Sequence, residues 1–326
     1  MTGVRVMSDD DELSRLLRAS NPARTLLDAR PDAAALAVRD RIMGSAKIAR
    51  ARAMPRLVYA AAAAMVVVAV AALAVFLPRG AAVAVTPVSI SFTSGGTVSE
   101  VLSMAHSKLA TSTGPQAPVR GSHTVMWGLS LDADEQRVEI VPQLATLTWN
   151  EDLSGAFRAV TGEPYWPAGT APTDATSAAK PGDVLSEMSF AAGEYGTPVV
   201  EVPGGSRSDV MALLSAFGLP ENPTASDVVQ ALMSAFDHWT LTNEQHAQLL
   251  SILVDTGGLT VLGSGEDRAG REVVGVETKS IFPGVKDLVL ISAGTGRIVG
   301  VESSRVTPDG IVPSGAVISY RLWDTA

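Results

Sequence analysis

Residues 272–305 read EVVGVETKSIFPGVKDLVLISAGTGRIVGVESSR, and this stretch decides the fold of the C-terminal third of the chain. It holds three runs rich in valine, leucine and isoleucine, and the turns between them contain Pro283-Gly284 and Gly294-Thr295-Gly296. Short apolar runs bounded by glycine and proline are typical of antiparallel strands joined by hairpins. Together with the flanking runs at 259–263 and 316–323, the stretch predicts an antiparallel meander.

Upstream of the meander, strand signals alternate with helix signals. Thr97 with Glu100 and Thr242 with Gln245 form capping boxes, and apolar residues recur at helical spacing elsewhere. The helices are predicted at 98–110, 208–217, 224–239 and 242–254, and further strands at 122–131, 137–141, 144–149 and 156–160. We therefore expect an α+β domain over residues 88–326, in which helices pack on an antiparallel β-sheet.

A different pattern precedes this domain. Residues 57–77 read LVYAAAAAMVVVAVAALAVFL and contain no charged side chain. A helix of this length spans roughly 31 Å, which matches the hydrocarbon core of a bilayer. The alternative is a buried helix of a soluble core, but such a helix normally carries a polar stripe. We expect one transmembrane helix here, with Leu57 and Leu77 at its ends and the ring of Tyr59 near the interface.

The distribution of charge predicts the orientation of this helix. The chain has a net charge of -9, but residues 1–56 are net basic and residues 78–326 are strongly acidic. The positive-inside rule then gives a single-pass plasma-membrane protein with a cytoplasmic N-terminus. A cleaved signal peptide is the alternative, but its apolar region is only about 7–15 residues long. The expected parts are a cytoplasmic helical segment (1–56), the transmembrane helix (57–77), a linker (78–87) and an extracytoplasmic domain (88–326).

The cytoplasmic segment carries one apolar face. Leu13, Leu16 and Leu17 follow the acidic run 9–12 at helical spacing, and carboxylates in a first turn favour a helix. This face either docks on a cytoplasmic partner or belongs to a tail that only sets the topology. The basic residues between 39 and 56 are of the kind that contact anionic lipid head groups.

Several short motifs resemble those of a known family. They are Asp267-Arg268-Ala269-Gly270-Arg271, the stretch from Thr295-Gly296 to Glu302 and, near the N-terminus, Asp11-Glu12-Leu13 followed by Leu16-Leu17. Over essentially its whole length the chain resembles uncharacterised actinobacterial single-pass membrane proteins that are often encoded beside extracytoplasmic-function sigma factors. The resemblance implies a membrane location and a link to a sigma factor, and it implies no functional residues.

The order of the predicted elements also resembles that of a more distant group of proteins. A leading helix followed by antiparallel strands is similar to periplasmic half-barrel proteins of the lipoprotein-carrier and anti-sigma-regulator type. Those proteins curve an antiparallel sheet around an apolar groove. A likeness at this level concerns the fold and does not transfer function.

The sequence contains no motif of a catalytic, cofactor or metal site. Its lack of cysteine excludes thiolate zinc sites and cysteine nucleophiles, and its acidic charge argues against nucleic-acid binding. His238 and His246 do not have the spacing of a helical zinc pair, and the histidines are expected at the surface or at caps. Ser264 lies in a turn rather than a nucleophile elbow. Trp166, in a proline-rich loop, either covers a groove or packs on its own sheet.

Three functions follow from these patterns. The first is a membrane-anchored, non-enzymatic regulatory or sensory protein, in which residues 1–56 bind a sigma factor in an anti-sigma role. The alternative is an extracytoplasmic lipid- or ligand-binding module that the membrane helix tethers. An enzyme of the cell envelope has no motif in its favour. The expected partners are the lipid bilayer, a sigma factor and a lipid or envelope ligand, with no cofactor and no nucleic acid.

Overall fold

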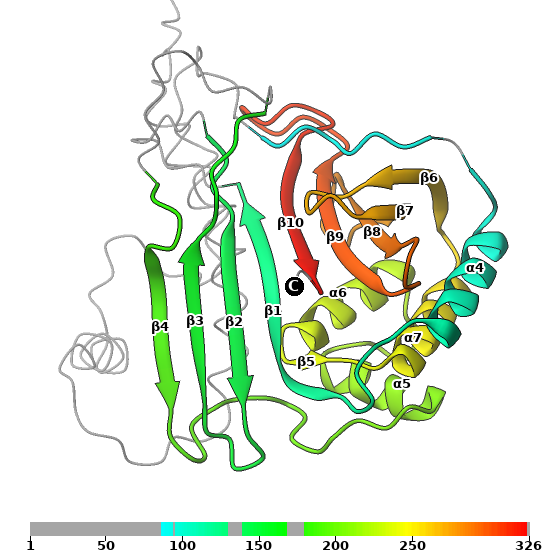
Figure 1. The fold of residues 1–326 in the computed structure, drawn as a ribbon. Coiled ribbons are helices and arrows are strands. Elements are labelled where there is room, and N and C mark those ends of the chain that lie inside the picture. The colour runs from blue at the N-terminus through cyan, green and yellow to red at the C-terminus, as the bar shows by residue number, and fades with distance from the viewer. Residues whose placement is uncertain (1–85, 94, 130–138, 168–178, 325–326) are drawn as a thin grey trace, which may run out of the picture. The chain divides into compact units, whose positions relative to one another are not determined.

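The computed structural model describes residues 86–93, 95–129, 139–167 and 179–324, which all belong to one compact unit of the chain, residues 59–326. The described part is a long antiparallel β-sheet with four helices (Figure 1). The predicted cytoplasmic segment, with Leu13, Leu16 and Leu17, lies outside the described residues, as does the predicted transmembrane helix with Leu57, Tyr59 and Leu77.

The strands that the structure describes form one continuous sheet in which every neighbouring pair is antiparallel. Their order is β4-β3-β2-β1-β10-β9-β8-β7-β6, and the short strand β5 pairs with the start of β1. Their bounds are β1 (Val119–Gly128), β2 (Gln143–Trp149), β3 (Gly155–Thr161), β4 (Val184–Phe190), β5 (Trp239–Thr240), β6 (Thr260–Glu266), β7 (Glu272–Lys279), β8 (Val285–Ser292), β9 (Ile298–Arg305) and β10 (Val317–Trp323). The five strands predicted in the C-terminal third are therefore present as β6–β10, paired in chain order.

Each described helix begins with a capping box, in which a serine or threonine hydroxyl accepts from the third backbone N–H of the helix. The side chain at that third position in turn accepts from the N–H of the capping residue. The helices are α4 (Val98–Thr111), α5 (Arg207–Ala216), α6 (Ala225–Phe236) and α7 (Asn243–Asp255). These caps fix where the chain leaves the sheet and turns into the helical layer.

The main core lies between the helices and one face of the sheet. Leu232 and Leu249, from α6 and α7, are fully buried with Val289 of β8. The opposite face of the sheet carries a smaller cluster around Leu290 and Leu322. Because both faces of β7–β9 are covered, these strands read as nearly continuous apolar runs rather than as alternating ones. Figure 1 shows β1–β4 side by side, with the helices gathered near β5–β10.

The segment 86–93 covers the second face of the sheet and reaches its edge at β6. The backbone of Thr93 exchanges two hydrogen bonds with Ser264, at 2.8 and 3.1 Å. The ring of Phe92 lies over Gly275 so closely that a Cβ there would stand 2.6 Å from it. Gly275 is therefore the residue that lets this segment lie flat on β7.

None of the helices in the described ranges has the length and apolarity that a bilayer crossing requires. The longest, α4, has 14 residues, or about 21 Å, whereas a crossing needs about 20 residues. This finding corrects the predicted fold class of α+β with one transmembrane helix. Over the ranges that the structure describes, the chain is dominated by a ten-stranded antiparallel sheet with four helices. The predicted single-pass location in the plasma membrane and the transmembrane anti-sigma character are corrected with it.

Candidate functional site

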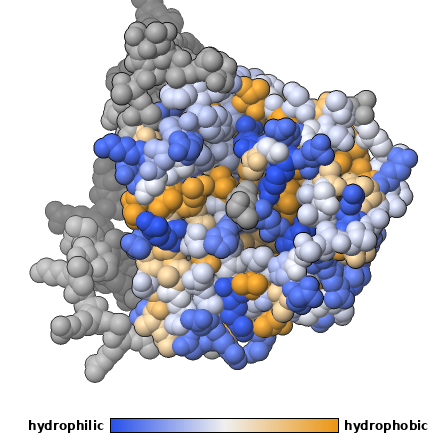
Figure 2. Space-filling view, in the orientation of Figure 1, coloured by the Kyte–Doolittle hydropathy of each residue, from blue (hydrophilic) through white to orange (hydrophobic). Residues whose placement is uncertain are grey.

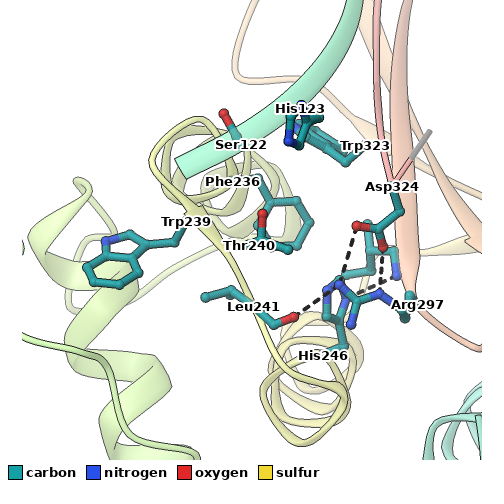
Figure 3. Close-up of a pocket in the computed structure, with 11 residues that line it drawn as sticks. Ser122, His123, Phe236, Trp239, Thr240, Leu241, His246, Arg297, Trp323 and Asp324 are labelled. Carbon is teal, nitrogen blue, oxygen red and sulfur yellow. Dashed lines mark hydrogen bonds and ion pairs between the residues drawn. The ribbon is translucent and has the colours of Figure 1, made fainter. Parts of the chain in front are cut away.

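A cavity of about 270 Å³ opens between the end of α6, β5, the start of α7 and strands β1, β9 and β10 (Figure 3). Pockets for small molecules typically measure roughly 300–1,000 Å³, so this cavity suits a small ligand. Its apolar wall consists of Phe236, Trp239, Leu241, Ile298 and Trp323. Its polar groups belong to Ser122, His123, Thr240, His246, Arg297 and Asp324.

Hydrogen bonds from two hydroxyls hold β1 against the α6–β5 connection at the cavity. Ser122 Oγ donates to the carbonyl of Asp237 at 2.9 Å, and Thr240 Oγ1 donates to the carbonyl of Gly121 at 3.0 Å. Gly121 has a φ of +137°, and a Cβ there would stand 2.2 Å from the carbonyl oxygen of Leu147. Only glycine permits this close approach of β1 to β2, and the approach shapes this side of the cavity.

The guanidinium of Arg297 is buried at the polar end of the cavity, and each of its three nitrogens donates to an oxygen of the protein. Nε lies 2.5 Å from Oδ2 of Asp324, and Nη2 lies 3.4 Å from Oδ1. Nη2 also donates to the carbonyl of Leu241 at 3.0 Å, while Nη1 donates to Oδ1 of Asn243 at 2.9 Å. Asp324 reaches this position with a φ of 55°, a left-handed conformation that is uncommon outside glycine. The pair leaves the cavity with no net charge at this end.

His246 lies beside Arg297 with an uncharged ring. Its side chain comes from the first turns of α7, and the residue is 2% exposed. Nδ1 accepts from the backbone N–H of Ile298 at 3.1 Å, so the neutral ring carries its proton on Nε2. Burial, and then the charge of Arg297, hold the pKa of His246 well below its usual range. Within the described part of the chain, Nε2–H has no acceptor.

Two indoles in the wall also keep unpartnered donors. The Nε1 atoms of Trp239 and Trp323 are buried and make no hydrogen bond with the residues that the structure describes. The ring of Trp323 packs edge-on against Phe236, with centroids 5.0 Å apart. Figure 3 shows the indole of Trp239 extending away from His246 and Arg297. A buried donor without an acceptor costs about 1–3 kcal/mol.

An aromatic cluster supports the wall from behind. The ring of Trp239 meets that of Trp149 edge-on at 4.8 Å, and the guanidinium of Arg120 lies 5.3 and 5.5 Å from the two ring centroids. Tyr195 OH lies 2.5 Å from Nδ1 of His238. Burial raises the pKa of Tyr195 and lowers the pKa of His238, so both groups are neutral. The cluster supports the wall, although Nε of Arg120 and Nε1 of Trp239 make no hydrogen bond with the residues that the structure describes.

The motif Asp267-Arg268-Ala269-Gly270-Arg271 forms the turn between β6 and β7 and fastens it to the rest of the sheet. Arg271 donates from Nε to Oδ2 of Asp267 at 2.7 Å, and its other nitrogens donate to the carbonyls of Trp323 and Val299. Arg268 Nε lies 2.5 Å from Oε2 of the buried Glu302. These charged groups bind one another and the backbone, so the motif is structural here.

Among the residues singled out by sequence reasoning, His246 lines this cavity, whereas Ser264 and Trp166 do not. Ser264 pairs with Thr93 at the sheet edge, and Trp166 is half-buried with an unpartnered indole N–H among the described residues, away from the cavity lining. The expectation of surface or capping histidines is wrong for His246. A signal for its burial exists in the sequence, because the buried Leu249, Leu250 and Leu253 follow it at three, four and seven residues, on one helix face.

No protein-family model matches the chain, and no curated protein sequence matches it. Among solved structures, the chain is similar to an outer membrane lipoprotein-sorting protein domain from Vibrio parahaemolyticus. The match has 11% identity and a TM-score of 0.21, and it covers 68% of this chain and 75% of the other. A likeness this weak assigns neither fold nor function, so the function has to follow from the cavity itself.

Proposed function

We propose that this domain is a binding module that holds a small apolar molecule in the cavity between α6, β5, α7 and β10. The supporting observation is a wall of aromatic and aliphatic side chains that also holds hydrogen-bond donors without a partner. The indole N–H of Trp323 and the Nε2–H of His246 belong to lining residues and have no acceptor among the described residues. An apolar molecule with one hydrogen-bond acceptor would satisfy such a wall.

The polar groups of the cavity support binding rather than bond breaking. The hydroxyls of Ser122 and Thr240 donate to backbone carbonyls, and Nδ1 of His246 is occupied by the N–H of Ile298. A nucleophile needs a base within hydrogen-bond reach, and these groups do not form such a pair. The described residues also contain no group of three side chains suited to a metal ion. We therefore propose a non-enzymatic role.

Binding can be followed with n-octanol and methyl octanoate as probes of the full chain. Each probe is expected to change the fluorescence of the tryptophans in the wall and to raise the melting temperature as its concentration increases. His123, an exposed residue at the cavity, is the position at which to obstruct entry. His123→Trp is expected to weaken probe binding by about tenfold or more, a loss of at least about 1.4 kcal/mol.

Val184→Trp is the matched control, because Val184 is an exposed strand residue on β4 and does not line the cavity. It adds the same indole and is expected to leave probe binding unchanged. The proposal fails if wild-type protein shows no saturable response to either probe, or if both variants bind the probes as wild type does.

A regulatory role through a sigma factor stays a prediction from the sequence. Residues 1–56, with Leu13, Leu16 and Leu17, would carry that contact, and they lie outside the described residues. The lipid- or ligand-binding alternative has the cavity in its favour, so it is the function proposed here.

A further inference from the structure

The polar end of the cavity contains the type of side chain that normally captures a carboxylate. Arginine offers a planar fork of N–H donors that matches a carboxylate or phosphate. In this chain the fork of Arg297 already faces the carboxylate of Asp324, with Nε–Oδ2 at 2.5 Å and Nη2–Oδ1 at 3.4 Å (Figure 3). The carbonyl of Leu241 accepts from Nη2, and Oδ1 of Asn243 accepts from Nη1, so each nitrogen of the guanidinium has a partner in the protein.

The same pair offers a cation no unpaired anionic group. The carboxylate of Asp324 is engaged by Arg297, and its side chain is 30% exposed. The other polar groups at this end are the neutral ring of His246 and the hydroxyls of Ser122 and Thr240, which donate to backbone carbonyls. An ammonium group placed here would lose its hydration and gain no free anionic partner.

From this geometry we infer that the cavity selects uncharged ligands, and that Asp324 sets this selectivity by occupying the guanidinium of Arg297. The inference rests on the proposed function and names its ligand class. That class is an apolar molecule whose polar end is an uncharged hydrogen-bond acceptor, such as an ester or ketone carbonyl. A carboxylate is excluded because Asp324 repels it and holds the donors that would bind it.

The test compares three probes with the same apolar chain on the full-length protein at neutral pH: methyl octanoate, octanoate and octylamine. Wild-type protein is expected to bind methyl octanoate at least about tenfold more tightly than either charged probe, because an unpaired charge is costly to bury. In Asp324→Asn the guanidinium of Arg297 loses its anion. Octanoate is then expected to bind at least about tenfold more tightly than it binds wild type.

Two further variants separate selectivity from folding. Asp324→Glu keeps the carboxylate and is expected to keep the preference for methyl octanoate. Asp309→Asn removes the partner of Arg305, whose Nη2 lies 2.9 Å from Oδ2 of Asp309 away from the cavity lining. It serves as the matched control and is expected to leave all three affinities unchanged. Circular dichroism spectra verify that each variant retains the wild-type fold.

The outcomes distinguish the two proposals. If wild-type protein binds none of the probes, the proposed function fails. If it binds octanoate or octylamine as tightly as methyl octanoate, the module stands and the selectivity for uncharged ligands is overturned. If wild type prefers methyl octanoate but folded Asp324→Asn gains no affinity for octanoate, the role assigned to Asp324 is overturned.

Discussion

At the scale of single residues, the buried charges of this domain differ in how completely they are compensated. Arg271 and Arg297 each bind a carboxylate and backbone or amide oxygens. Asp287, on β8, is fully buried, and only its Oδ1 has a partner, the hydroxyl of Ser303 at 2.7 Å. Its Oδ2 makes no hydrogen bond with the described residues. Burial, which outweighs the bond from Ser303, raises the pKa of Asp287.

This raised pKa predicts a specific dependence of stability on pH. The stability that protonated Asp287 contributes is complete below its unfolded pKa, about 3.9, and is lost as the pH rises through its folded value. Asp287→Asn removes this loss, and the free energy of unfolding at pH 7 is expected to rise relative to wild type. In thermal melts from about pH 4 to about pH 8, the advantage of the variant should grow with pH. An advantage that is equal at all pH values would contradict this account.

Individual residues of the candidate site were only partly accessible to sequence reasoning. The burial of His246 follows from its place on the leucine face of α7. The contact of Arg297 with Asp324 joins residues 27 positions apart, one just before β9 and the other just after β10. The bonds of Arg297 to Leu241 and Asn243 depend on how α7 packs. The residues of such a cluster show no characteristic spacing in the sequence, because only the tertiary fold brings them together.

At the scale of elements, local chemistry decides where helices begin. The capping boxes predicted at Thr97 and Thr242 are present, and two more occur at Ser206 and Thr224. At Thr224 the hydroxyl accepts from the N–H of Asp227, while Asp227 accepts from the hydroxyl at 2.6 Å and from the N–H of Thr224 at 2.8 Å. These bonds replace the intrahelical partners that a first turn lacks.

Loss of this cap gives a quantitative prediction. Thr224→Ala is expected to lower the free energy of unfolding by about 1 kcal/mol, because the backbone N–H of Asp227 at the start of α6 loses its acceptor. Urea titrations should show a lower midpoint with an unchanged slope. Ser103→Ala, at an exposed position inside α4, is the control and is expected to leave the midpoint unchanged or slightly raised. Equal midpoints for Thr224→Ala and wild type would show that the cap does not stabilise α6.

Strands were harder to predict than helices where their environment is unusual. The strands within 272–305 could be predicted from the sequence because they are short, apolar and separated by turns that contain glycine. β4, by contrast, is an edge strand with exposed Val184, Leu185 and Met188, and its sequence suits strand or coil equally. A predicted strand at 137–141 is represented in the described residues only by the bridge of Ile140 to Tyr165. Whether such a segment forms a strand depends on its pairing with a neighbouring strand, and the sequence does not show that pairing.

At the scale of the whole molecule, the pairing of β1 with β10 turns two groups of strands into one sheet. Thr124 lies opposite Trp323 in this pair, and Leu147 and Trp149 of β2 share the main core with Val289 of β8. The sequence predicted both groups of strands but not their union, because the partners lie at opposite ends of the domain. The membrane part of the prediction is corrected on different grounds. It rested on the length and apolarity of 57–77, on the charges on either side and on the family resemblance, whereas no helix among the described residues has the length of a span.

Because one core serves both groups of strands, the domain is expected to unfold as a unit. Tryptophan fluorescence, which reports Trp149 and Trp239 near the helices, and far-ultraviolet circular dichroism, which reports the sheet, should give coincident thermal transitions. The expected difference between their midpoints is less than about 1 °C, since each 1 kcal/mol corresponds to about 2–4 °C in a domain of this size. Two separated transitions would mean that β1–β4 and β6–β10 are independent.

The strap formed by residues 86–93 bears on how this chain reaches its native state. Thr93 bonds to Ser264 across 171 positions, and Ser89 bonds to Gly315 across 226. The β1–β10 pair is comparably remote, so much of the sheet depends on contacts between the first and last parts of the domain. Contacts of such large sequence separation must overcome the entropy of closing long loops, which slows folding. Until the strap docks, Ile90 and Phe92 do not cover the cluster around Leu290 and Leu322. This apolar face of the sheet is therefore exposed to aggregation until a late stage of folding.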